Sequence, residues 1–237
     1  MSLKESHKPY PASWAEMYYP NYSLREKLTA VDRRQAFRYM GLPENPDQKF
    51  LDLAEICEKK LLQAIQPRYC WKLFQKSDLE FLLLGQDIQK HLMNCQEMIL
   101  FCATLSQHTD TCIRLVQTSD VLAGMMTDAM ASALTEQLCD AAELEILENF
   151  KQKYATWRFS PGYGDFPLSV QSDILALLQA QKTTGICLTE SNLMTPRKSV
   201  TAIIGLSDQP VEKTRKGCTA CNLSKNCPYR MKGVHCN

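Results

Sequence analysis

The chain has 237 residues, of which 45% are hydrophobic and 22% are charged, and its formal net charge is +1 at pH 7. These values predict a globular protein with a substantial core, and the balanced charge argues against a nucleic-acid-binding surface. No apolar run approaches the roughly 18 residues that span a bilayer. The polar amino terminus has no apolar core of a signal peptide, so we expect a cytoplasmic protein that binds neither nucleic acid nor membrane.

The amino-terminal part of the sequence predicts an arm followed by helices. Residues 1–30 are rich in proline, tyrosine and polar groups, which is typical of an irregular arm. A short helix is expected over residues 32–39, because Asp32 is a good N-cap and Gly41 follows the segment. Apolar residues at helical spacing predict an amphipathic helix over residues 47–66.

The next segments mix strand-like and helical patterns. Residues 69–74 and 81–84 are aromatic or aliphatic and predict two strands of a hairpin or meander. A helix is expected over residues 87–94. The apolar run 98–105 has the length of a strand buried on both faces, and we expect this strand at the centre of the sheet.

The carboxyl-terminal half predicts further helices and two strands. Residues 109–117 predict a short helix, and Asp120 is placed to cap a long helix that reaches about residue 153. A helix over about 168–181 precedes strands at 186–189 and 199–206. Helices and strands do not alternate regularly. The predicted fold class is therefore α+β, with a mixed or antiparallel curved sheet flanked by helices.

A glycine- and proline-rich loop over residues 158–167 (RFSPGYGDFP) separates two of these helices. Its glycines allow backbone conformations that a side chain forbids, its prolines stiffen the turn, and its arginine offers a planar fork for a carboxylate or phosphate. The loop therefore predicts a ligand-binding site. Its candidate binding residues are Arg158, Ser160, Pro161, Gly162, Tyr163 and Gly164.

The order of motifs after this point resembles a known family. The pattern Arg-x-x-x-Gly-Tyr at residues 158–163 is followed by Leu-Thr-Glu-Ser at 188–191 and by Ser-Val at 199–200. This combination resembles the activation domain of cobalamin-dependent methionine synthase, in which Arg-x-x-x-Gly-Tyr is the signature for S-adenosylmethionine. The resemblance implies one activation domain-like unit over residues 31–210, followed by a cysteine-rich tail over residues 211–237.

The resemblance also implies roles for single residues. Arg158 would bind the carboxylate of S-adenosylmethionine through a strong, charge-assisted pair. Tyr163 would stack on adenine, donate its hydroxyl or lie near the sulfonium, or would only pack at the base of the loop. Glu190 would bind ribose or ammonium, and Asp140 aligns with a ligand-associated carboxylate of the family. We expect Asp165, by contrast, to cap the helix that follows the loop.

The implied function is support of reductive methylation of cobalamin on methionine synthase or another corrinoid protein. The chain contains no Asp-x-His-x-x-Gly corrinoid pattern, so we expect the cobalamin on a partner and the module to act in trans. A flavodoxin-type protein would donate the electron. Ile203 and Ile204 stand where the family has aromatic residues, so a non-catalytic partner protein with a degenerate pocket is an alternative.

The sequence contains eleven cysteines, and four of them are close together near its end. Seven are scattered through apolar segments and are expected to be small buried hydrophobic residues. The four of the tail could hold zinc or an iron–sulfur cluster, or could be reduced thiols of a flexible tail. A metal or iron–sulfur redox protein on the same fold is therefore a further alternative. The tail cysteines are Cys218, Cys221, Cys227 and Cys236.

Overall fold

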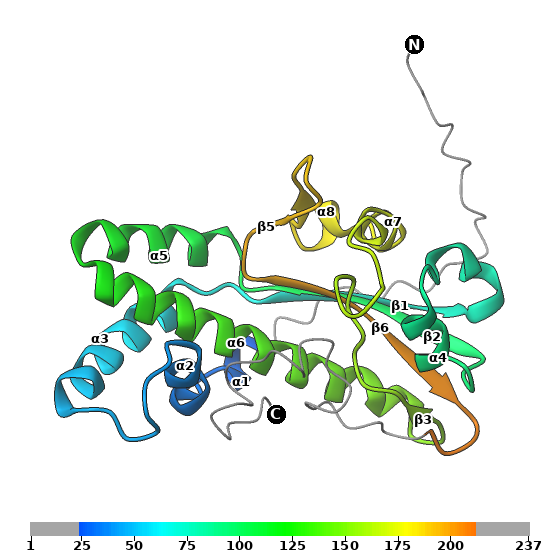
Figure 1. The fold of residues 1–237 in the computed structure, drawn as a ribbon, viewed down its shortest axis with the longest axis horizontal. Helices are drawn as coiled ribbons and strands as arrows, with labels where there is room; N and C mark the ends of the chain where they lie inside the picture. The colour runs from blue at the N-terminus through cyan, green and yellow to red at the C-terminus, as the bar shows by residue number, and fades with distance from the viewer. Residues whose placement is uncertain (1–23, 212–237) are drawn as a thin grey trace, which may run out of the picture.

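The protein is described by a computed structural model that covers residues 24–211, in which a four-stranded antiparallel sheet carries helices on both faces (Figure 1). The strands, in spatial order, are β1 (Arg68–Gln75), β2 (Glu97–Thr104), β6 (Ser199–Ser207) and β3 (Tyr154–Ala155). Strand β2 pairs along its whole length with both β1 and β6, so the predicted central strand is confirmed. The α+β class with an antiparallel sheet is confirmed as well.

One face of the sheet packs against α6 and the helices that surround it. The helices of this layer are α1 (Leu24–Lys27), α2 (Arg33–Tyr39), α3 (Gln48–Ala64), α5 (Gln107–Ser119) and α6 (Val121–Leu147), which continues into η2 (Glu148–Phe150). The opposite face is covered by shorter elements. These are η1 (Lys76–Leu82), α4 (Gln86–His91), α7 (Val170–Leu177) and α8 (Ala180–Thr183), with a small hairpin of β4 (Cys187–Leu188) and β5 (Met194–Thr195) close by.

Alternation along β2 divides the core between these two faces. Ile99 and Phe101 belong to the apolar cluster on the α6 side, whereas Leu100 and Cys102 belong to the cluster on the α7 side. Successive side chains of a strand point to opposite faces. A strand buried on both faces must therefore be apolar at every position, which explains the continuous hydrophobic run in the sequence.

Both predicted helix caps are confirmed. The carboxylate of Asp32 accepts a hydrogen bond from the backbone N–H of Gln35, and that of Asp120 accepts one from Ala123. Asp120 also ends α5 and begins α6, so a single residue sets the corner between these two antiparallel neighbours. The long helix ends at Leu147, ahead of the predicted residue 153.

The predicted strand at residues 81–84 is wrong. The chain forms the 3-10 helix η1 there, with Leu79 and Leu82 fully buried and Phe81 and Leu84 about half exposed. The segment is kinked at Leu79 (φ −124°, ψ 25°), so two short helical turns, rather than a strand, bring Leu79 and Leu82 into the core. The expected helix over 168–181 is also interrupted, because Gln179 adopts a left-handed conformation (φ 49°) between α7 and α8.

Two further expectations concern the arm and the cysteines. Within the range expected to be irregular, residues 24–27 form α1, and Leu24 and Leu28 are buried in the core. All seven scattered cysteines are unpaired thiols, of which five are buried and Cys112 and Cys187 are half-buried. The four tail cysteines lie outside the described residues.

Among residues 24–211, no helix is long and apolar enough to cross a membrane.

Candidate functional site

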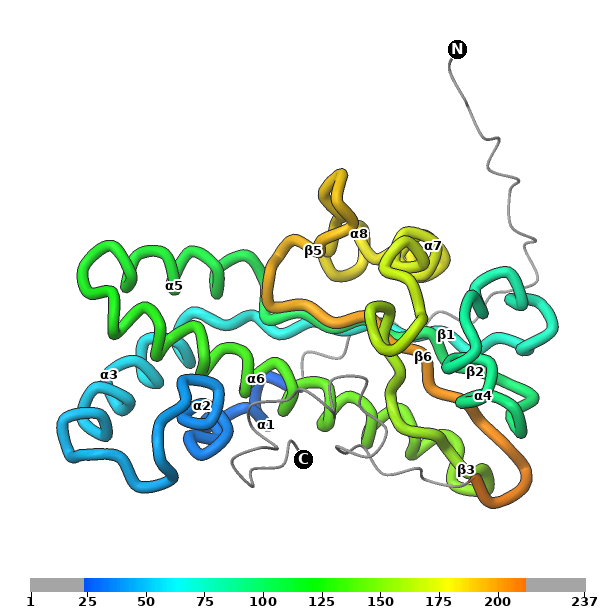
Figure 2. The backbone as a smooth tube through the Cα atoms, viewed as in Figure 1, coloured from blue at the N-terminus to red at the C-terminus, as the bar shows by residue number. Residues whose placement is uncertain are grey.

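The loop is positioned by the segment that follows β3, which runs along the open edge of β6. The N–H of Thr156 donates to the carbonyl of Gly205 at 2.9 Å, and Phe159 and Ile203 exchange two backbone hydrogen bonds of 2.9 and 2.8 Å. Figure 2 shows this part of the chain passing from the side of α6 to the side of α7. This pairing fixes where the Arg158 side chain leaves the backbone.

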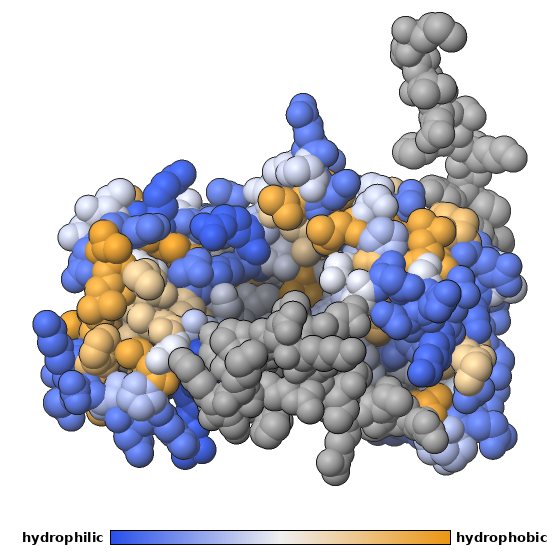
Figure 3. Space-filling model, in the orientation of Figure 1, coloured by the Kyte–Doolittle hydropathy of each residue, from blue (hydrophilic) through white to orange (hydrophobic). Residues whose placement is uncertain are grey.

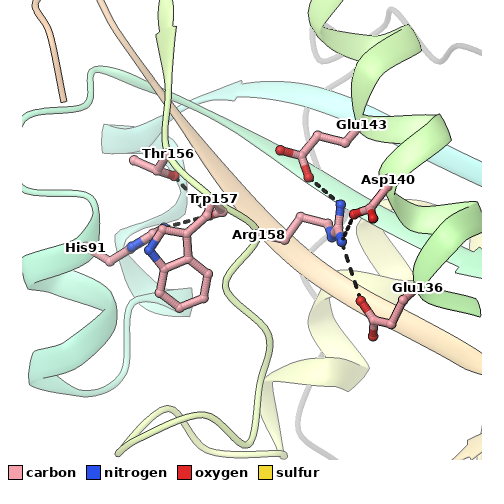
Figure 4. A network of polar contacts seen from close by, with 7 residues as sticks. All are labelled: His91, Glu136, Asp140, Glu143, Thr156, Trp157 and Arg158. Carbon is pink, nitrogen blue, oxygen red and sulfur yellow. Dashed lines mark hydrogen bonds and ion pairs between the residues drawn. The ribbon is translucent and has the colours of Figure 1, made fainter. Parts of the chain in front are cut away.

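Arg158 is buried and directed at α6. Its guanidinium Nη2 lies 2.7 Å from Asp140 Oδ1 and 3.5 Å from Glu136 Oε2, and its Nη1 donates to Glu143 (Figure 4). Only 5% of the arginine side chain is exposed, compared with 67% of Asp140 and 45% of Glu136. The cation is therefore held below two carboxylates that solvent can reach.

The electrostatic balance of this group is negative, because one guanidinium faces three carboxylates. Burial by itself lowers the pKa of the Arg158 guanidinium, but the neighbouring anionic groups, including Asp140 and Glu143, outweigh burial and raise it. The arginine thus stays charged. The excess of carboxylates makes the site favourable for positive charge.

The structure brings together some of the predicted residues and leaves one apart. Asp140, inferred from the family alignment, contacts Arg158 directly. Glu190 is exposed in the turn between β4 and β5, and within residues 24–211 the ion pairs of Arg158 are all with α6. Glu190 therefore remains a prediction that no contact at Arg158 supports.

The predicted turn residues close the loop on itself. Gly162 N–H donates to the Phe166 carbonyl at 2.7 Å, and Tyr163 N–H donates to the Ser160 carbonyl at 3.1 Å. Gly162 has φ 94°, a conformation that favours glycine. Pro161 is buried, whereas Gly162 and Tyr163 are exposed. The loop thus presents its Gly-Tyr pair to solvent.

Asp165 does not cap the helix that follows the loop, so that expectation is wrong. Its carboxylate accepts from the backbone N–H groups of Gln86 at 2.6 Å and Asp87 at 3.0 Å, which begin α4. The hydrogen bond from Asp87 N–H has the largest effect in lowering the pKa of Asp165, and the hydrogen bond from Gln86 N–H lowers it further. Gly164 has φ 54°, and a Cβ there would lie 1.9 Å from Asp87 Oδ2, so glycine suits the place where the loop meets α4.

Aromatic rings surround the base of the loop on the side away from Arg158. The Tyr163 ring lies edge-on to Trp157, with centroids 6.3 Å apart, and 6.0 Å from Phe159. His91 packs against both Trp157 and Phe159 at 4.8 and 4.9 Å. Figure 4 shows Trp157 and Arg158 pointing in opposite directions from adjacent positions. One side of the Tyr163 ring therefore packs on Trp157 and Phe159, while 57% of the residue is exposed.

We predict that His91 makes stability depend on pH. Burial lowers its pKa from 6.5 to about 4, against the opposing effect of its hydrogen bond with the Trp157 carbonyl (2.9 Å). Between these values the unfolded state binds a proton that the folded state does not, so stability falls as the pH is lowered from about 7 to about 4. The loss should be on the order of 2 kcal/mol.

Urea unfolding of the wild type and of His91→Gln at several pH values measures this contribution. We expect a smaller loss between pH 7 and pH 4 in the variant. His108→Gln is the matched control, because His108 is exposed at the start of α5. Parallel pH curves for the wild type and His91→Gln would contradict the assignment.

A second buried cation lies on the same helix face, toward the start of α6. Lys198 Nζ contacts Asp128 Oδ1 at 3.0 Å and Ser132 Oγ at 2.8 Å. An open cleft of about 420 Å³ adjoins it, with Asp128, Ser132 and Arg197 among its lining residues. Figure 3 shows a hollow in the middle of this face with apolar side chains visible inside it. One face of α6 thus carries carboxylates that contact two buried cations, Lys198 near its start and Arg158 further along.

Sequence reasoning missed Glu136, Glu143 and the support of Tyr163 by His91 and Trp157. The signal for the carboxylates is present in the sequence, since residues 136, 140 and 143 recur at the spacing that places side chains on one helix face. Ile203 and Ile204, which replace aromatic residues of the family, are fully buried on opposite faces of β6. Ile203 pairs with Phe159 beneath the loop.

Comparison with known proteins places this arrangement in a family. The family model described as "Vitamin B12 dependent methionine synthase, activation domain" matches residues 85–211. The structure described as "Crystal Structure of the MetH Reactivation Domain bound to AdoHcy" resembles the chain with a TM-score of 0.55 and 16% sequence identity, over 92% of this chain and 86% of that one. No curated protein sequence matches the chain.

The two comparisons cover the elements that build the site. The structural likeness, at this low identity, shows that the fold is shared. The family match spans more than half of the sequence and includes α6, the segment after β3, the whole loop and β6. The chain therefore belongs to the family of activation domains of vitamin B12-dependent methionine synthases.

Proposed function

We propose that this protein binds S-adenosylmethionine and supports the reductive methylation of cobalamin on methionine synthase or another corrinoid protein, acting in trans. The observation that carries the proposal is the placement of Arg158. In a member of the activation-domain family, the arginine of Arg-x-x-x-Gly-Tyr is buried, charged and held beside solvent-exposed carboxylates, with an exposed tyrosine on the same loop.

The charges of the site complement those of the ligand. S-adenosylmethionine carries one carboxylate and two positive groups, the ammonium and the sulfonium. Arg158 would pair with the carboxylate, and the half-exposed Glu136 and the exposed Asp140 would turn from Arg158 toward the ammonium or sulfonium. The more enclosed Glu143 (22% exposed) would keep the guanidinium oriented while the other two carboxylates reorient.

The protein's own contribution to methyl transfer would be positional. When bound, S-adenosylmethionine supplies the methyl group that its sulfonium carries. Holding the sulfonium at a fixed place at the protein surface turns an encounter of separate molecules into a reaction within one assembly. Since the sequence has no Asp-x-His-x-x-Gly pattern, the cobalamin would belong to a partner, and a flavodoxin-type donor would supply the electron.

Calorimetric titration with S-adenosylmethionine tests the binding step, and Tyr163 provides a variant with a specific expectation. The Tyr163→Ala protein should bind on the order of tenfold more weakly, because it loses an aromatic surface for adenine or the sulfonium. Its unfolding free energy should change by less than about 1 kcal/mol, since most of the ring is exposed. Absence of any binding by the wild type would remove the central claim.

A matched control separates the ring of Tyr163 from tyrosines in general. Tyr154 on β3 is 48% exposed, close to the 57% of Tyr163, but lies outside the loop. The Tyr154→Ala variant should bind S-adenosylmethionine like the wild type. Equal weakening by both substitutions would mean that the Arg-x-x-x-Gly-Tyr tyrosine has no special role.

The corrinoid part of the proposal requires a separate reconstitution. A methionine synthase lacking its own activation domain would be inactivated by oxidation of its cobalamin and mixed with this protein, S-adenosylmethionine and reduced flavodoxin. Recovery of methyl transfer only in the complete mixture would support action in trans. Binding of S-adenosylmethionine without recovery would instead favour a different corrinoid partner.

Two alternatives are tested by other measurements. The three carboxylates around Arg158 favour a partner protein with a degenerate pocket. Such a protein would capture methionine synthase whether or not S-adenosylmethionine is present.

A metal or iron–sulfur redox protein would rely on the tail. Metal analysis and an anaerobic absorption spectrum, with and without residues 217–237, would detect that metal, and a colourless, metal-free protein would exclude it. Within residues 24–211, no cluster of three or more metal-ligating side chains occurs.

A further inference from the structure

Two cysteine thiols face each other inside the sheet, away from the Arg158 site. Cys70 of β1 and Cys102 of β2 are direct partners in the antiparallel register. Their Sγ atoms lie 3.2 Å apart, and both residues are buried, with 3% and 0% of their surface exposed. Both belong to the apolar cluster on the α7 side of the sheet.

The backbone at this pair already has the spacing that a disulfide needs. Directly opposed residues of antiparallel strands have Cα atoms about 4.5–5.5 Å apart, and disulfides join Cα atoms about 4.4–6.8 Å apart. Bond formation would shorten the sulfur–sulfur distance from 3.2 Å to about 2.05 Å. Small rotations of the two side chains can supply that movement without a change of strand register.

The surroundings distinguish the two thiols. Thr183, at the end of α8, donates its hydroxyl to Cys70 Sγ at 3.3 Å, and the Thr184 hydroxyl lies 3.9 Å from Cys102 Sγ. The hydrogen bond with Cys102 lowers the pKa of Cys70, whereas burial raises the pKa of Cys102. Cys70 is therefore the better nucleophile of the pair, because the thiolate is the reactive form.

Short helices cover this pair on the α7 side of the sheet. The carbonyl of Leu178, just after α7, lies 3.9 Å from Cys70 Sγ, and the four-residue helix α8 packs on β1. Helix α8 begins after the left-handed Gln179 and is followed by Gly185 at φ 82°. A single helical turn between two residues with positive φ opens more easily than a long helix, because few hydrogen bonds must break. Local opening of α8 would expose the two sulfur atoms to a small oxidant.

We propose that Cys70 and Cys102 form a reversible dithiol that a hydroperoxide oxidises to a cross-strand disulfide. The Cys70 thiolate attacks one oxygen of hydrogen peroxide, which gives a sulfenic acid and, after proton uptake, water. The Cys102 thiolate then attacks Cys70 Sγ, and the sulfenic oxygen leaves as a second water. In total two thiols lose two electrons and two protons, and one peroxide is reduced to two waters. This inference does not depend on binding of S-adenosylmethionine.

Peptide mapping of the folded full-length protein tests the proposal. The reduced protein is treated with hydrogen peroxide, the remaining thiols are alkylated under denaturing conditions, and the digest is analysed by mass spectrometry. We expect a peptide that links Cys70 to Cys102 and disappears on reduction with dithiothreitol. Recovery of both residues in separate alkylated or sulfinic peptides would overturn the proposal.

Single substitutions provide the controls. The Cys95→Ala variant should form the Cys70–Cys102 link like the wild type, because Cys95 is a buried thiol in the same cluster that is not part of the pair. The Cys70→Ala variant should leave Cys102 alkylatable after peroxide treatment. Because the linked peptide is sought first in the wild type, the test stands even if Cys70→Ala fails to fold. A link formed only in denatured wild-type protein would refute the inference.

Discussion

Replacement of Arg158 by alanine is expected to weaken binding of S-adenosylmethionine strongly and to destabilise the fold at the same time. The guanidinium is 5% exposed and is the partner of three carboxylates of α6. Removing one member of a buried charge pair that contacts a ligand costs about 2–5 kcal/mol of binding free energy. We therefore expect affinity to fall by about 100-fold or more.

The loss of stability follows from the groups that the substitution leaves behind. Glu143 is only 22% exposed, so its charge would remain partly desolvated without a cation, whereas Asp140 and Glu136 can turn to solvent. The cost of one such unsatisfied group is about 1–3 kcal/mol. The free energy of unfolding should therefore decrease by about 2 kcal/mol, which urea unfolding would detect.

Two further variants separate binding from stability. Arg158→Lys keeps the charge but not the planar fork, so it should retain most of the stability and lose most of the affinity. Arg33→Ala removes an arginine that is ion-paired with Glu58 of α3 and makes no ion pair with the carboxylates around Arg158. This control should lower stability without changing affinity. If Arg158→Ala bound S-adenosylmethionine as tightly as the wild type, the motif arginine would be structural only.

Patterns with a single physical cause could be predicted from the sequence. The central strand β2 was predictable because burial on both faces demands an unbroken apolar run. The start of α6 was predictable because Asp120 satisfies backbone N–H groups of its own helix. The structure of residues 81–84 was not predictable, because their apolar run fits both a strand and a helical turn. In the folded chain the helical turn brings Leu79 and Leu82 into the core.

The candidate site was predictable only as far as its motif. Arg158 and Asp140 come from one motif and one alignment, and they meet in the structure. The partner of Asp165 could not be predicted, because its carboxylate crosses 78 positions of sequence to cap α4. An N-cap normally lies beside its own helix, so local reasoning assigns such an aspartate to the nearest helix. Contacts of this kind depend on the tertiary fold.

The capping by Asp165 shows how the loop is held in place. The Asp165 carboxylate connects the loop to α4 through hydrogen bonds from the backbone N–H groups of Gln86 and Asp87. Phe159 connects the loop to β6 through backbone hydrogen bonds. Phe166, next to Asp165, joins Phe159 in the buried core on the α7 side of the sheet. Its side chain is 1% exposed, and its ring lies 6.0 Å from that of Phe159. Packing of this ring therefore helps to fix the position of the Gly-Tyr pair, together with the hydrogen bond from Gly162 N–H to the Phe166 carbonyl.

We accordingly expect Phe166→Ala to lower the free energy of unfolding by about 3–5 kcal/mol, the usual cost of emptying a phenylalanine site in a core. Affinity for S-adenosylmethionine should fall as well, because the released loop no longer fixes Tyr163 relative to Arg158. Urea unfolding and calorimetry at a temperature where the variant is still folded measure the two effects. Phe81→Ala, which removes a ring that is 48% exposed on η1, should cost less than about 1 kcal/mol and leave affinity unchanged. Similar losses for the two variants would show that Phe166 does not anchor the loop.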